Sequence, residues 1–109
     1  MATISTTNNV VTTINTFTVE PHHQQRALEL LLEIAGQLRA VVPGFLSANF
    51  HTSVDGIRVV NYAQYSSQEA VQEVTAKILG NMEIPQLSEL REIATPDART
   101  YEVCATLEG

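Results

Sequence analysis

Two kinds of hydrophobic spacing follow one another in the first part of the chain. Residues 10–19 are rich in Val, Ile, Thr and Phe, which suit a half-buried strand. From His22 to Val42, polar residues recur at spacings of three and four and leave the opposite side apolar; they are Arg26, Glu29, Glu33 and Gln37. This period predicts a long amphipathic helix that packs on a sheet and ends at Pro43-Gly44.

The middle of the chain predicts a β-hairpin. Residues 45–53 and 57–65 have strand composition and meet around Asp55-Gly56. A two-residue turn would pair Phe50 with Asn61 and mix polar and apolar side chains on both faces. A three-residue loop, 54–56 with Gly56 left-handed, separates the faces better, so we predict that register. It places on one face Leu46, Ala48, Phe50, Val60 and Tyr62, and on the other Phe45, Ser47, Asn49, His51, Val59, Asn61, Ala63 and Tyr65.

The last third predicts two helices and a strand. Ser66 and Glu69 have capping-box spacing and open a helix to about Leu79. Pro85 starts a shorter helix that Pro96 ends, and residues 99–107 alternate as a final strand. The order β-α-β-β-α-α-β predicts an α+β fold of the ferredoxin-like kind, with the helices on one sheet face. Because the other face carries several large apolar residues, we expect two copies to form a homodimer through it.

Composition restricts the partners and the location. The chain has 109 residues and a net charge of −6, with Lys77 as its only lysine, which argues against nucleic acid. The single cysteine, Cys104, forms no internal disulfide. No apolar run is long enough to span a membrane. We expect residues 1–9 to be a flexible leader, residues 10–109 to be one domain, and the location to be cytoplasmic.

The predicted register also gathers candidate site residues. It places Asn49, His51, Asn61 and Tyr65 on one face, which Asn15 and Phe17 join from the first strand; Arg91, on the last helix, is a candidate partner for a substrate anion. In an apolar cavity, such polar groups are typical of a small-molecule site. In such a site a histidine such as His51 could act as a base, and amides of Asn61 or Asn15 could hold an oxyanion.

Metal binding is not predicted, since the sequence has no His-x-x-x-His, no cysteine pair and no carboxylate cluster with ligand spacing. His22 and His23 are adjacent and are expected to diverge into solvent.

Several segments resemble the antibiotic biosynthesis monooxygenase family, of the dimeric α+β barrel superfamily. They are residues 14–19, Pro43-Gly44-Phe45, and Asp55-Gly56 followed by residues 59–67. The resemblance implies dimers formed by packed sheets, and a cavity between sheet and helices. It implies oxidation of polycyclic phenols to quinones by O₂ without metal, flavin or haem. His51 would then remove the phenolic proton, and the electron-rich substrate would itself reduce O₂, so no cofactor is expected. The resemblance also implies pocket roles for Asn61, Tyr65, His51 and Asn15.

One position departs from the family pattern, because the place of Tyr65 is usually Trp in the oxygenases. Two hypotheses therefore stay open. The first is a cofactor-independent monooxygenase acting on a small aromatic metabolite of the phenol or quinol type. The second is a non-catalytic small-ligand-binding or stress-related dimer of the same fold.

Overall fold

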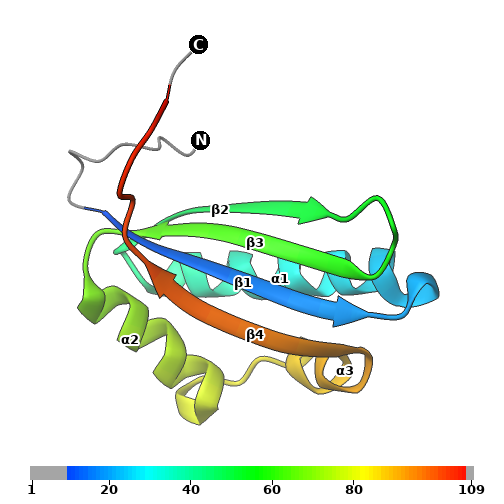
Figure 1. The fold of residues 1–109 in the computed structure, drawn as a ribbon. Coiled ribbons are helices and arrows are strands. Elements are labelled where there is room, and N and C mark those ends of the chain that lie inside the picture. The colour runs from blue at the N-terminus through cyan, green and yellow to red at the C-terminus, as the bar shows by residue number, and fades with distance from the viewer. Residues whose placement is uncertain (1–9, 108–109) are drawn as a thin grey trace.

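The computed structural model describes residues 10–107, apart from the side chain of Asn81. Its centre is a four-stranded antiparallel sheet with the strand order β2-β3-β1-β4. The strands are β1 Val11–Val19, β2 Phe45–Thr52, β3 Arg58–Tyr65 and β4 Ala94–Tyr101. The helices cover one face of this sheet (Figure 1), which confirms the predicted α+β ferredoxin-like fold. The expected leader, residues 1–9, lies outside the described residues.

The helices follow the predicted order with shorter bounds. They are α1 Gln24–Val41, preceded by the 3₁₀ turn η1 Pro21–His23, then α2 Gln68–Ala76, the π-helical turn η2 Lys77–Asn81, and α3 Gln86–Ile93. Ser67, not Ser66, caps α2, because its hydroxyl accepts the Ala70 N–H at 3.2 Å. None of the described helices is long and apolar enough to cross a bilayer.

The core lies between α1 and the helix-covered face of the sheet. From α1 it receives Ala27, Leu30, Leu31, Ile34 and Leu38, and from the central strand β3 Val59, Ala63 and Tyr65. Arg26 of α1 holds α3 by a two-pronged contact with Glu89, with nitrogen–oxygen distances of 2.6 and 2.7 Å. This contact joins α3 to α1 above the sheet.

The hairpin register differs from the predicted one. The observed pairs include Phe50 with Asn61 and His51 with Val60, which is the register that we rejected from the sequence. A bulge between Phe45 and Ser47 shifts the pairing, so that Phe45 still faces Tyr65. Phe50 therefore lies on the helix-covered face with Asn61, whereas Ser47, Asn49 and His51 lie on the opposite face. The predicted grouping of Asn49 and His51 with Asn61 is wrong.

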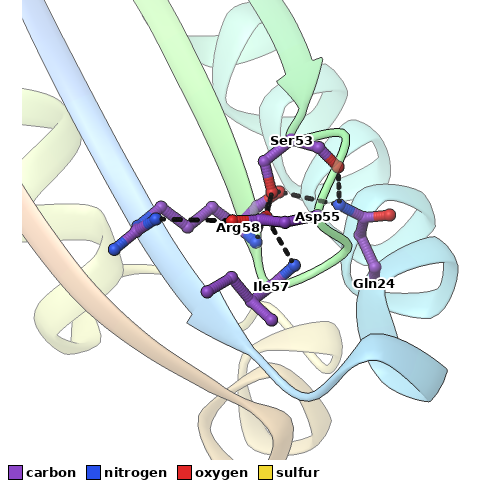
Figure 2. A network of polar contacts seen from close by, with 5 residues as sticks. All are labelled: Gln24, Ser53, Asp55, Ile57 and Arg58. Carbon is purple, nitrogen blue, oxygen red and sulfur yellow. Dashed lines mark hydrogen bonds and ion pairs between the residues drawn. The ribbon is translucent and has the colours of Figure 1, made fainter.

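The loop itself explains this register (Figure 2). Ser53 pairs with Arg58 across a four-residue loop, 54–57, where its N–H donates to the Arg58 carbonyl at 3.0 Å. The Asp55 carboxylate accepts the Ser53 hydroxyl at 2.7 Å and the Ile57 N–H at 3.2 Å. These hydrogen bonds hold the pKa of Asp55 below its usual value. Gln24 donates to the Ser53 and Arg58 carbonyls at 3.0 Å each and ties the loop to α1. Gly56 has the predicted positive φ, 83°.

The last strand begins earlier than predicted. β4 runs over Ala94–Tyr101 and contains Pro96, which we had taken as the end of the preceding helix. Pro96 pairs with Phe17 of β1, and β4 lies at the edge of the sheet. An edge strand tolerates proline because one side of its backbone needs no partner. Residues 102–107, expected in the strand, continue beyond it.

Two glycines offer a matched test of the packing. A Cβ at Gly44 would lie 2.5 Å from the Ala70 Cβ and 2.7 Å from the Ser66 Oγ, whereas one at Gly36 would meet nothing within 4 Å. We expect Gly44→Ala to lower the free energy of unfolding by about 1–3 kcal/mol through overpacking. The control, Gly36→Ala in α1, should raise it by about 0.5–1 kcal/mol. Urea denaturation measures both, and an unchanged stability for Gly44→Ala would contradict this contact.

Candidate functional site

A cavity of about 300 Å³ lies between the sheet and the helices. The sheet contributes to its floor Asn15 and Phe17 of β1, and Ala94, Pro96 and Ala98 of β4. The helices close it with apolar side chains, among them Leu31, Ile34, Ile78, Leu87 and Leu90. Leu79, 78% exposed, lies at its border and marks an opening to solvent. An apolar cavity with few polar groups is the usual form of a small-molecule site.

Three of the predicted site residues border this cavity: Asn15, Phe17 and Arg91. Asn15 and Phe17 point to it because alternate residues of β1 share the helix-covered face. The exposed Arg91 comes from the last turn of α3 and donates to the Ile78 carbonyl at 3.5 Å. This contact holds a guanidinium group at the border of an otherwise apolar space.

Asn61 is not among the residues that line the cavity, but it lies directly across from Asn15, which does line it, in the pairing of β1 with β3. Such cross-strand side chains on one face are about 4.5–5.5 Å apart at Cβ. Asn61 is 8% exposed, and its Oδ1 accepts the Asn49 N–H at 3.2 Å. Its Nδ2 donates to no described residue. The two asparagines therefore place amide groups next to each other on the helix-covered face of the sheet.

Tyr65 shares this face but lies in the core. It is 4% exposed, packs against Phe45 with ring centroids 5.1 Å apart, and does not border the cavity. Burial raises the pKa of its phenol. The neighbouring Thr13 hydroxyl opposes this rise in the pKa of Tyr65, although it forms no hydrogen bond among the described residues. The Tyr65 phenol thus stays protonated at neutral pH and is no base.

The other two predicted residues lie elsewhere. His51 is exposed on the face that no helix covers. Asn49 lies on that face as well, where its Nδ2 donates to the Tyr62 carbonyl at 3.0 Å. Asn49 also borders a separate groove of about 270 Å³ between α1 and the edge strand β2. The predicted role of His51 as a base at the cavity therefore has no geometric support.

The cavity as described has a single ionisable group at its border, Arg91, and no carboxylate or imidazole. The wall can stabilise an anion, but it offers no base to create one. Thr75 of α2 also borders the cavity and was not predicted from the sequence. Its hydroxyl donates to the Val71 carbonyl at 3.0 Å. Its spacing of three residues from Ile78, which puts both side chains on one helix face, is the sequence signal that could have indicated it.

Comparison with known proteins agrees with this architecture. The family model described as antibiotic biosynthesis monooxygenase matches residues 10–76. Tetracenomycin-F1 monooxygenase of Streptomyces glaucescens is 44% identical over 68 residues, which are 62% of this chain. The match spans 61% of that curated relative.

Two solved structures extend the likeness over nearly the whole chain. A monooxygenase from the gene ActVA-Orf6 of Streptomyces coelicolor, in complex with the ligand Nanaomycin D, is 31% identical with a TM-score of 0.67 and 91% of each chain covered. SnoaB, a cofactor-independent oxygenase from Streptomyces nogalater, is 22% identical with a TM-score of 0.71 and covers 93% of this chain and 99% of its own; at this identity it supports the fold alone. The resemblance noted in the sequence is confirmed, and the chain belongs to the antibiotic biosynthesis monooxygenase family.

Proposed function

We propose that this chain is a cofactor-independent monooxygenase that oxidises a small aromatic metabolite of the phenol or quinol type to a quinone. The observation that carries the proposal is the apolar cavity with Asn15 on its floor, which pairs with Asn61, and with Arg91 at its border. Family membership supports the same reaction class. At about 300 Å³ the cavity is at the lower end of the usual range for ligand pockets, which favours a compact two- or three-ring substrate.

The reaction that we propose balances without a further reductant. The phenol loses its O–H hydrogen and one hydrogen of a ring carbon, that carbon gains one oxygen atom as a carbonyl, and the second atom of O₂ leaves as water. The substrate anion transfers an electron to O₂, the two radicals join at that carbon, and the resulting hydroperoxide loses water to form the carbonyl. All electrons come from the substrate.

The protein's part in this proposal is to stabilise the anion. The Asn15 and Asn61 amides offer N–H donors to the oxygen that gains charge, and Arg91 offers a positive charge. Since none of the described residues that border the cavity is a base, the proton leaves to water once the anion is stabilised. This revises the sequence-based hypothesis, in which His51 was the base. The pH dependence of turnover should then follow the substrate rather than a histidine.

The second candidate is a non-catalytic binding module, the alternative hypothesis that the sequence leaves open. Two observations favour it: the lack of a base among the described residues that border the cavity, and Tyr65 in place of the usual Trp of the oxygenases. Oxygen uptake with a panel of dihydroxynaphthalenes and anthrones separates the two. A monooxygenase consumes one O₂ per quinone formed, whereas a binding module binds such compounds without oxygen uptake.

We also propose that two copies pair through the open face, defined as the sheet face that no helix covers. Its half-buried apolar residues are Ile14, Val60 and Tyr62. The Tyr62 hydroxyl is buried and finds no hydrogen-bond partner among the described residues. Charged residues, Arg58, Asp97 and Arg99, surround this apolar centre, as is common at protein interfaces. We had predicted that Phe50 belongs to this interface, but it lies on the helix-covered face and cannot take part.

A further inference from the structure

A cluster of potential metal ligands lies at the corner between β1 and α1. The side chains of Glu20, His22 and His23 each bring a ligand atom within 4.8 Å of the other two. The imidazole rings do not diverge as we expected, because their centroids are only 4.0 Å apart. The Nδ1 of His22 lies 3.6 Å from a carboxylate oxygen of Glu20. None of these residues borders the cavity described above.

We propose that Glu20, His22 and His23 form a binding site for a divalent cation of the zinc type. Two imidazoles and one carboxylate are a ligand set that Zn²⁺ accepts, with water at the fourth position. Magnesium and calcium prefer oxygen ligands and should not compete for it. The site is distinct from the proposed oxygenase site and does not depend on it.

The backbone holds the three ligands in place. Pro21 opens the 3₁₀ turn, and the His23 N–H donates to the Glu20 carbonyl at 2.9 Å. All ligands therefore belong to one closed turn of four residues, so binding orders little additional chain. Pro21 also packs near Gly56, since a Cβ on that glycine would lie 3.5 Å from the Pro21 Cβ. The turn is thus supported from the hairpin loop.

The side chains have the freedom that binding requires. Zinc bonds of about 2.0–2.2 Å to nitrogen and oxygen place tetrahedral ligands about 3.3 Å apart. Because the ligand atoms lie within 4.8 Å of one another, the longest separation must shorten by up to about 1.5 Å. The side chains of His22 and Glu20 are 67% and 75% exposed, so small rotations achieve this without displacing the core. Among the described residues, Glu20 has no ion pair other than the one with His22. The net charge of −6 attracts cations to the surface.

Zinc titration of the tag-free, chelator-treated full chain tests this site by calorimetry. We expect one Zn²⁺ per chain, and an affinity that falls by about 10–100-fold in His22→Ala and in His23→Ala. Zn²⁺ at 100 times its Kd should raise the Tm of the wild type on the order of 10 °C, and that of the double histidine variant far less. Mg²⁺ at the same concentration should do neither.

Two controls make the result specific. His51→Ala removes the only other histidine of the chain and should leave zinc affinity within about twofold. Glu20→Gln should weaken binding, whereas Glu33→Gln on the exposed surface of α1 should not. Binding that persists in the double histidine variant, or that depends on His51, would overturn the proposal. So would the failure of millimolar Zn²⁺ to bind or to shift the Tm.

Discussion

Replacing Asn61 by alanine is expected to lower kcat on a phenolic substrate about 100-fold or more. The proposed reason is the loss of an amide donor to the substrate oxygen that gains charge, and removal of one such donor typically has an effect of this size. The effect on folding should be smaller. Asn61 accepts one backbone hydrogen bond, from Asn49 at 3.2 Å, and its loss costs about 1–2 kcal/mol. Steady-state oxygen uptake and urea denaturation measure the two effects separately.

The matched control is Asn49→Ala. Asn49 also hydrogen-bonds within the hairpin, through the Tyr62 carbonyl at 3.0 Å, but it lies on the opposite face of the sheet. Its replacement should lower stability by a similar amount and leave kcat within about threefold. If both variants lose turnover equally, the loss reports the hairpin rather than the amide, and the role proposed for Asn61 is wrong.

Val60→Asp is expected to abolish the proposed dimer. Val60 lies near the centre of the open face, paired with Thr16 on one side and His51 on the other. Two copies would bring two aspartates into an interface that excludes water, and an unpaired buried charge costs several kcal/mol. The apparent Kd of the dimer should therefore rise by about a thousandfold or more. Light scattering should give about twice 11.9 kDa for the wild type and 11.9 kDa for the variant.

Val54→Asp is the control for this experiment. It adds the same charge at a fully exposed position of the hairpin loop and should leave the mass unchanged. A wild type that stays monomeric at micromolar concentration, or a Val60→Asp variant that stays dimeric, would contradict pairing through the open face.

The order of elements could be predicted from the sequence because each element has a strong local signal. The polar stripe of α1 from Arg26 to Gln37 determines which side meets the sheet, and the structure buries the opposite side. The same holds for Asn15 and Phe17, whose common face follows from strand alternation alone. The family resemblance rested on segments between residues 14 and 67, and the family model matches residues 10–76.

The position of His51 could not be predicted in the same way. A shift of one residue in the pairing exchanges the two faces of β2, and the sequence pattern favoured the wrong choice because it separated polar from apolar residues better. The observed register, which mixes polar and apolar side chains on each face, is stabilised in two ways. The Ser53–Asp55 loop network fixes the turn, and the bulge at Leu46 returns Phe45 to the core. Neither the loop hydrogen bonds nor the bulge has a distinct sequence signal.

Oxidation of an anthrone under ¹⁸O₂ by the chelator-treated, flavin-free chain tests the proposed activity most directly. We predict that the quinone carries one ¹⁸O atom, that one O₂ disappears per quinone, and that Asn61→Ala slows this reaction about 100-fold. Heat-unfolded protein gives the rate of spontaneous oxidation. A wild-type rate no faster than that background, or a quinone without the label, would contradict the oxygenase function.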